Sequence, residues 1–193
     1  MSSPPTRRYV GPYTILHSRP VYENLWLKVR EDRVAYRDGV ESTFGVVAMK
    51  PGVSVLPLEE DGTVYLVREF KYALGDSSLE VVSGGVESGE NADVAALREL
   101  EEEAGLTATE WVDMGVVHPF TTVVSSPNRM FLCRGLAKSR RPRPLGEHAE
   151  IVTMSLEDAL YGVLRGQITH GASCVLILKT KLFLEKPGAR RSA

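Results

Sequence analysis

One stretch of the sequence, residues 84–106, constrains what this chain can fold into more than any other part. It reads GGVESGENADVAALRELEEEAGL: two glycines, an isolated Glu90, and a run of alanine, leucine and glutamate that stops at Gly105. Alanine, leucine and glutamate are strong helix formers, and glycine readily takes the left-handed conformation that follows many helix C-termini. The stretch therefore predicts a helix over residues 92–104, beginning shortly after the paired glycines.

Three glutamates of the predicted helix, Glu99, Glu102 and Glu103, share one face, because residues three and four positions apart are neighbours on a helix. Like charges at this spacing repel by roughly a few tenths of a kcal/mol per pair. The positive charge of Arg98 offsets part of this repulsion. Glu101 points to the opposite side of the helix from the three glutamates. A solvated acidic face is the simplest explanation. A divalent cation explains more, because Mg²⁺ binds carboxylate oxygens and bridges to substrate phosphates.

The positions of these residues resemble a complete Nudix box. Gly84 is followed after five residues by Glu90 and, after seven more, by Arg98-Glu99-Leu100-x-Glu102-Glu103-x-Gly105-Leu106, with agreement at every signature position. The motif fixes so many positions that it is highly specific. The resemblance implies a Mg²⁺-dependent hydrolase, with Mn²⁺ as an alternative ion, that acts on a nucleoside diphosphate linked to another group.

The chain around the box resembles the ADP-ribose pyrophosphatase and nucleoside-diphosphate-sugar hydrolase branch of that superfamily. The resemblance rests on an extra β-rich segment before the box and on three softer echoes, VYENLWLKVRED, YLVREFKYALGDSSLEVVSGG and SLEDALYGVLRGQIT. The chain departs from the branch at Val82-Ser83, where a proline and an alanine are common. It departs again at Asn128, where a glycine often follows Ser-Pro. The resemblance implies a homodimer that pairs through the N-terminal β segment.

The same resemblance assigns metal ligands residue by residue. Glu99, Glu102 and Glu103 are the expected ligands, and Glu90 is a fourth candidate. The alternative role of Glu90 is that of an acid favoured at a helix N-terminus by the helix dipole. Arg98 either holds Glu102 or a neighbour in place or contacts phosphate. We therefore count Glu99, Glu102 and Arg98 among the residues expected to be needed for catalysis.

The base that deprotonates the attacking water lies, in the resembling branch, on a late loop that precedes a short strand and the last two helices. Glu147 and Glu150 stand there, in the segment LGEHAEIV. We prefer Glu147, because Glu150 borders the predicted strand. A solvated loop acid is the alternative for each, and a box glutamate is a further candidate for the base.

Four further residues are candidate substrate contacts by the same resemblance. Arg68 and Glu80 lie on predicted strands beside the box, although a structural ion pair would explain them equally well. Gly84 and Gly85 let the backbone approach a metal ion or phosphate closely; a tight turn is the alternative.

The remaining pattern predicts an α/β fold, in which a Nudix-like α/β/α sandwich with a mixed sheet follows a small antiparallel β subdomain. We expect the β subdomain to span residues 1–50, with about nine poorly ordered residues at its start, and the catalytic domain to span 51–193. Leu97, Leu100 and Ala104 form an apolar stripe that we expect to pack on the sheet. Within the catalytic domain we predict a hairpin of strands 53–58 and 63–70, strands at 79–82, 111–117, 130–136 and 151–154, and helices after Ser155 and over 172–184.

Composition limits the classes of function. A net charge of −2 over 193 residues does not predict nucleic-acid binding. No apolar run reaches the length of a membrane span, and the N-terminus lacks the apolar core of a signal peptide. Cys133 and Cys174 lack metal-ligand spacing, which indicates reduced packing residues. We expect a cytoplasmic protein that binds a small nucleotide.

These observations support three hypotheses of different classes. The first is a Mg²⁺-dependent pyrophosphohydrolase that splits ADP-ribose or a related sugar nucleotide into a nucleoside monophosphate and a sugar phosphate, or that hydrolyses a dinucleoside polyphosphate. The second is a module that senses a nucleotide without turnover, and the third is an interaction protein with an acidic surface. The complete set of box acids favours the first.

Overall fold

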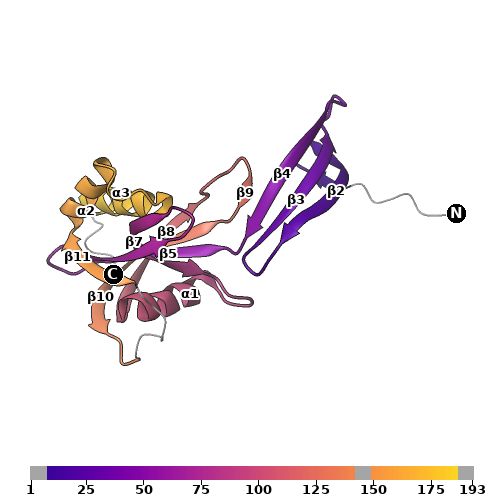
Figure 1. The fold of residues 1–193 in the computed structure, drawn as a ribbon. Coiled ribbons are helices and arrows are strands. Elements are labelled where there is room, and N and C mark those ends of the chain that lie inside the picture. The colour runs from indigo at the N-terminus through magenta and orange to yellow at the C-terminus, as the bar shows by residue number, and fades with distance from the viewer. Residues whose placement is uncertain (1–7, 142–148, 187–193) are drawn as a thin grey trace. The chain divides into compact units, whose positions relative to one another are not determined.

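The chain folds into two units (Figure 1). A computed structural model describes residues 8–141 and 149–186. The first unit comprises Met1–Lys50 together with Phe120–Ser126, and the second comprises Pro51–Pro119 and Pro127–Ala193. The boundary between the two units after Lys50 lies within the sequence Lys-Pro-Gly of residues 50–52. The segment Phe120–Ser126 belongs to the first unit although it lies far along the chain, which the prediction of one continuous segment 1–50 did not include.

The first unit is a sheet with the order β1-β2-β3-β4-β9. Its strands are β1 (Arg8–Val10), β2 (Tyr13–Glu23), β3 (Leu27–Ala35), β4 (Glu41–Met49) and β9 (Val124–Ser125). The first four strands pair antiparallel, as predicted, and the short β9 adds to β4 in parallel. Gly39, with φ of 88°, forms the turn between β3 and β4 that the Arg-Asp-Gly sequence indicates.

The first unit buries very little of its own surface. Among its described residues only Val34 and Asp32 are buried. The carboxylate of Asp32 accepts hydrogen bonds from Ser18 and Arg30, so its burial is compensated. Tyr22, Leu25 and Trp26 are 56%, 84% and 67% exposed. A two-faced sheet with so little burial lacks the hydrophobic face that independent stability requires.

The second unit is built on a mixed sheet with the order β11-β6-β7-β5-β10-β8. The strands are β5 (Gly52–Pro57), β6 (Thr63–Lys71), β7 (Asp76–Gly85), β8 (Leu106–Val117), β10 (Asn128–Lys138) and β11 (Glu150–Ser155). The predicted hairpin of β5 and β6 is wrong apart from its turn. β5 pairs in parallel with β10 and antiparallel with β7, and only the Leu58–Val64 bridge joins its end to β6.

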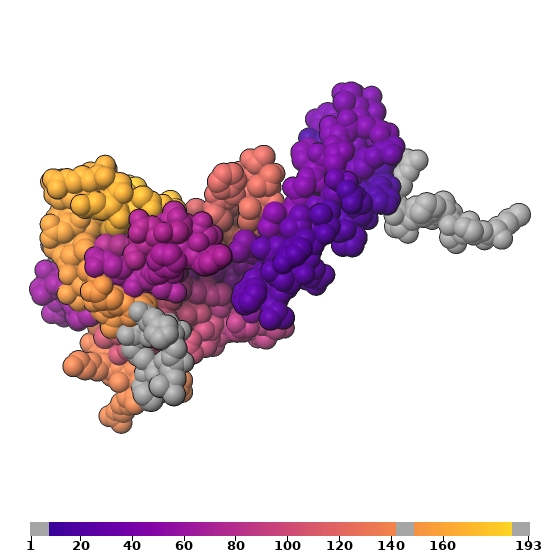
Figure 2. Space-filling model, viewed as in Figure 1, coloured from indigo at the N-terminus to yellow at the C-terminus, as the bar shows by residue number. Residues whose placement is uncertain are grey.

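Helices cover both faces of this sheet, which confirms the predicted α/β/α sandwich. On one face, α2 (Leu156–Leu164) and α3 (Gly171–Glu185) pack on a core that includes Leu66, Leu132 and Leu176. On the other face, the box helix packs on a second core that includes Val53, Val82 and Leu100. α2 and α3 lie side by side and form one continuous surface (Figure 2).

α2 and α3 were both predicted, and the ambiguous segment 172–184 is helical. Ser155 begins α2 as an N-cap, because its side chain accepts a hydrogen bond from the N–H of Asp158. The β-branched residues of α3 do not prevent the helix, since its buried face packs on the sheet. Within the described part of the chain, no helix is both long and apolar enough to cross a membrane.

The sheet opens at β7, which pairs with β6 along residues 76–81 and with β5 along residues 82–85. At the residue where the pairing with β5 has ended, the N–H of Val81 donates a hydrogen bond of 3.0 Å to Ser173 Oγ on α3. Ser173 is fully buried. A buried N–H without an acceptor would be costly. At this point the side chain of Ser173 supplies the acceptor that a neighbouring strand would otherwise supply.

Candidate active site

The box helix consists of two different helical segments. α1 (Ala92–Glu99) is followed without interruption by a π-helical turn, η1 (Leu100–Ala104), which ends at Gly105 with φ of 65°. The predicted start, end and left-handed glycine agree with the structure, but the prediction of an α-helix throughout is wrong for its second half. π-Turns within helices are rare and frequently lie at functional sites.

The predicted apolar stripe is only partly correct. Leu100 and Ala104 are buried against the sheet, but Leu97 is 44% exposed. Glu99 instead occupies the buried side of the helix together with Ala95. The carboxylate side and the apolar side of this helix therefore overlap, and the box acids lie against the sheet rather than on a separate face.

Arg98 gathers three of the box acids around its guanidinium group. Its Nε and Nη2 each donate a hydrogen bond of 3.0 Å to Glu90. Its Nη1 donates to Glu99 at 2.7 Å and to Glu102 at 3.0 Å, and Nη2 also donates to the Gly85 carbonyl at 2.8 Å. Sequence reasoning foresaw a bond from Arg98 to Glu102 or a neighbour. The structure brings all four charged groups into one network.

This network lowers the pKa of Glu90 and raises the pKa of Arg98. The hydrogen bonds from Arg98 hold the pKa of Glu90 below its usual value. The bonds to Glu90, Glu99 and Glu102 in turn raise the pKa of Arg98 above its usual value, although burial opposes that shift. Arg98 and Glu90 are therefore charged at neutral pH, and the guanidinium lies among three box glutamates.

Gly84 and Gly85 lie in β7 rather than in a tight turn, and both have ordinary backbone conformations. A Cβ at Gly84 would come within 2.0 Å of the Glu99 carboxyl group. The carboxylate of Glu99 therefore lies directly against the strand, in space that any other residue would fill. One residue earlier, the N–H of Ser83 donates to Glu103 Oε2 at 3.0 Å. Two adjacent residues of β7, Ser83 and Gly84, thus contact the box glutamates Glu103 and Glu99.

Glu80 belongs to a second charged cluster, which sequence reasoning did not foresee as a whole. Glu80 is 6% exposed and lies 3.9 Å from Lys71 Nζ and 3.3 Å from His170 Nδ1. Burial lowers the pKa of Lys71, but its hydrogen bond to Glu69 and nearby negative charges, including that of Glu103, raise it more. Burial also lowers the pKa of His170. Lys71 was missed because it lies opposite Asp76 in the pairing of β6 with β7, and its long side chain reaches along β7 to Glu80.

Arg68, a candidate substrate contact, and Glu150, a candidate base, form an ion pair. Arg68 and Glu150 are directly opposite each other on β6 and β11, and Arg68 Nη1 lies 3.3 Å from Glu150 Oε2. Both side chains are exposed to solvent. This geometry favours the alternative that Arg68 forms a structural ion pair rather than a substrate contact. The carboxylate of Glu150 is the partner in that pair. Glu147, the preferred base, lies outside the described residues.

Glu101 lies on the far side of the helix, away from Arg98. Its carboxylate accepts hydrogen bonds from Ser139 Oγ at 3.0 Å and Arg141 Nη1 at 3.3 Å. The Ser139 N–H also donates to the carbonyl of Gly105. Glu101 therefore fastens the segment that follows β10 to the end of the box helix, and it takes no part in the Arg98 network.

The donor set of the box fits a divalent cation chemically. Carboxylate oxygens are the ligands that Mg²⁺ prefers, the absent Cβ of Gly84 makes room for Glu99, and the guanidinium of Arg98 already stands as a cation among the acids. In the described ranges, no three His, Cys, Asp or Glu side chains already converge as metal ligands. Glu99 and Glu102 are turned towards Arg98 instead, so a bound cation requires these side chains to reorient.

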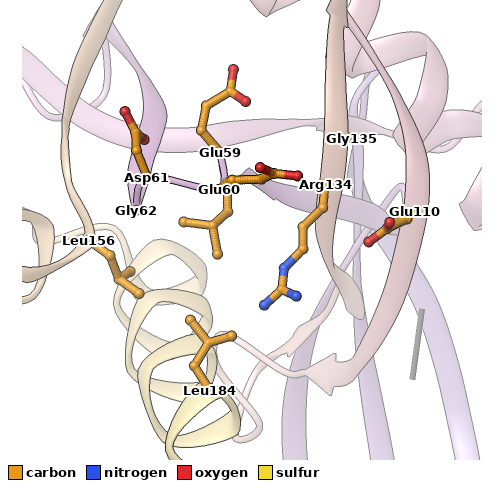
Figure 3. Close-up of a pocket in the computed structure, with 10 residues that line it drawn as sticks. Glu59, Glu60, Asp61, Gly62, Glu110, Arg134, Gly135, Leu156 and Leu184 are labelled. Atoms are coloured by element: carbon orange, nitrogen blue, oxygen red, sulfur yellow. The ribbon is translucent and has the colours of Figure 1, made fainter. Parts of the chain in front are cut away.

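A hollow of about 630 Å³ lies away from the box. Arg134, whose guanidinium extends towards Leu184, lines it together with the acids Glu59, Glu60 and Glu110 (Figure 3). Its lining contains none of the box residues. We place the candidate active site at the box, because convergent charged groups against a closely approached strand are more specific than cavity size.

Comparison with known families accounts for most of the chain. Residues 48–173 match the NUDIX domain, and residues 13–47 match the nucleoside diphosphate sugar hydrolase N-terminal domain. The two matches adjoin near Lys50, where the two units of the structure also meet in the sequence. The first match covers more than half of the chain and includes every box residue.

Individual relatives agree with this assignment. An ADP-ribose pyrophosphatase of Bacillus subtilis (strain 168) is 30% identical over 125 residues, which cover 64% of this chain and 68% of that protein. An ADP-ribose pyrophosphatase of Mycobacterium tuberculosis (strain ATCC 25618 / H37Rv) is 27% identical over 173 residues, 86% and 82% of the two chains. The crystal structure of an ADP compounds hydrolase shares the fold, with a TM-score of 0.79 at 19% identity over 94% of this chain and 99% of that one. The chain therefore belongs to the Nudix family, and it is a Nudix hydrolase with the N-terminal domain of nucleoside diphosphate sugar hydrolases.

Proposed function

We propose that this enzyme is a Mg²⁺-dependent pyrophosphohydrolase that converts ADP-ribose or a related sugar nucleotide to a nucleoside monophosphate and a sugar phosphate. The observation that carries the proposal is the network in which Arg98 binds Glu99 and Glu102 while the carboxylate of Glu99 lies against Gly84. The names of the two pyrophosphatase relatives support the substrate class.

Each box residue has a role in this proposal. Glu99, Glu102 and Glu103 would hold the cation, with Glu90 keeping Arg98 in place. A bound divalent cation supplies neutralisation of the diphosphate and lowers the pKa of a coordinated water. Because Gly84 has no side chain, it leaves room for the carboxylate of Glu99. Arg98 contacts Glu99 and Glu102 through one nitrogen, and Lys71 adds a positive charge near Glu103.

The reaction adds water across one phosphoric anhydride bond. The water oxygen forms a bond to one phosphorus, and the bridging oxygen leaves with the other phosphorus. The proton of the attacking water passes to a base, for which Glu147 remains our candidate. Glu150 is the weaker one, because Arg68 engages its carboxylate.

A substrate panel tests the proposal. We would incubate the protein with ADP-ribose, ADP-glucose, GDP-mannose and a dinucleoside polyphosphate in Mg²⁺ and identify the products by mass. The expected result is AMP and ribose 5-phosphate from ADP-ribose, and the same reaction in ¹⁸O water reports which phosphorus gains the oxygen. Nucleotide binding without products in either Mg²⁺ or Mn²⁺ would instead support the sensing module.

We also propose that two copies pair through the first unit. Its described part buries only Val34 and Asp32, while Leu25 and Trp26 are largely exposed. Exposed apolar surface of this extent on a small sheet is typical of an interface. A second copy of the chain would supply the burial that the isolated sheet lacks.

Light scattering on the purified protein checks this pairing. At micromolar concentration we expect a mass about twice the 21.2 kDa of one chain. The substitution Trp26→Asp should shift the protein towards monomer, because a buried charge weakens an apolar interface. Tyr72→Asp is the matched control, since Tyr72 is 95% exposed but belongs to the second unit. A wild-type protein that stays monomeric at these concentrations contradicts the proposal.

A further inference from the structure

The donors of Arg98 fall into two groups with different partners. Nε and Nη2 face both carboxylate oxygens of Glu90, and Nη2 also bonds the Gly85 carbonyl. Nη1 faces only box glutamates, Glu99 at 2.7 Å and Glu102 at 3.0 Å. One side of the guanidinium is therefore fixed to the loop and strand before the helix, and of its three nitrogens Nη1 is the one that contacts Glu99 and Glu102.

The fixed side does not depend on the helix acids. Glu90 precedes the helix, and it also accepts a hydrogen bond from the N–H of Glu87 at 2.9 Å. Its side chain is 13% exposed. Both of its oxygens accept from Arg98, and Oε2 also accepts from the Glu87 N–H. The partners of Nε and Nη2, Glu90 and Gly85, precede the helix, so these contacts need not change when Glu99 and Glu102 change partners.

The contacts of Nη1 serve a different purpose. Glu99 is buried against Gly84, and a buried carboxylate is costly without a positive partner. Guanidinium remains charged at every physiological pH and forms well-directed bonds to carboxylates. We propose that Arg98 is an internal counterion: its Nη1 neutralises Glu99 and Glu102 until a divalent cation takes both carboxylates, while Nε and Nη2 stay on Glu90 and Gly85.

This inference rests on the proposed metal dependence, and it makes a prediction that an arginine acting only to orient the acids does not. An internal counterion competes with the cation, so its removal strengthens metal binding. An orienting residue holds the ligands ready, so its removal weakens metal binding. The sign of the change in metal affinity therefore decides between the two roles, separately from the rate of turnover.

The test compares Mn²⁺ dissociation constants, measured as free Mn²⁺ by electron paramagnetic resonance, in the wild type and in Arg98→Gln. We expect Mn²⁺ to bind about tenfold more tightly to the variant, because two charge-assisted hydrogen bonds no longer oppose it, while turnover falls. Arg141→Gln is the matched control: it also removes one positive charge beside this helix, but its partner is Glu101. We expect Arg141→Gln to change the dissociation constant by less than about twofold, since exposed pairs are weakly coupled.

A second readout follows the arginine directly. On adding Mg²⁺ to ¹⁵N-arginine-labelled wild type, the Nη1 resonance of Arg98 should shift while its Nε resonance stays. If Arg98→Gln does not fold, Arg98→Met gives the same comparison, since it also removes the positive charge and keeps an unbranched side chain. Weaker or unchanged Mn²⁺ binding in the variant overturns the counterion role alone. A wild type that binds no metal overturns it together with the proposed function.

Discussion

Glu102→Gln should lower kcat by at least about a hundredfold while leaving the fold intact. Loss of an outer partner of a metal ligand already costs 10- to 100-fold, and Glu102 is proposed as a ligand itself. The side chain of Glu102 is 36% exposed, and glutamine keeps its size. Turnover of ADP-ribose in Mg²⁺ and the thermal unfolding midpoint are the two measurements.

Glu101→Gln is the control for this substitution. It removes the same charge from the neighbouring position, but Glu101 bonds Ser139 and Arg141 on the far side of the helix. Glutamine retains a carbonyl oxygen for Ser139, so we expect kcat to fall no more than severalfold. Equal damage from the two substitutions would show that the roles assigned along this helix are wrong.

Gly84→Ala is expected to be the most damaging replacement of a residue without a functional group. The new Cβ would lie 2.0 Å from the Glu99 carboxyl group, well inside contact distance. Because that group is the end of a flexible side chain, the strand can persist while the carboxylate moves. We therefore expect a loss of kcat of about a hundredfold and a weaker response to added Mg²⁺, with a smaller loss of stability.

Gly171→Ala is the matched control, because nothing lies within 4 Å of a Cβ built at Gly171. We expect this variant to keep its activity and its stability, because Gly171 is the first residue of α3 and the added methyl group meets open space. Full activity in Gly84→Ala would contradict the close approach of Glu99 to the strand. Activity and circular dichroism measured side by side separate misfolding from a displaced carboxylate.

The box and its surroundings could be predicted because their pattern is local. Helix formers between paired glycines and Gly105 define the helix ends, and the spacing of Glu99 and Glu102 from Arg98 brings them within reach of one guanidinium. The alternation before Lys50 and the turn at Gly39 likewise define the antiparallel first unit. In each case the information lies within a few residues of the feature that it specifies.

What could not be predicted depends on contacts between distant segments. The pairing of β5 with β10 rather than β6 is a property of the whole sheet, and it invalidated the predicted hairpin. The exposure of Leu97 follows from the burial of Glu99 under Gly84, which reverses the usual preference for leucine inside. The π-turn at Leu100–Ala104 has no known signature in these residues. The cluster of Lys71 with Glu80 depends on how far a long side chain of β6 reaches along β7.

The hydroxyl group of Ser173 has a consequence for how α3 can vary. Val81 and Ser173 are both fully buried, so water cannot replace the hydroxyl as the acceptor of the Val81 N–H. A side chain without an acceptor at position 173 would leave this N–H unpaired in the core, at a cost of about 1–3 kcal/mol. Position 173 is therefore restricted by the main chain of β7 as well as by helix packing.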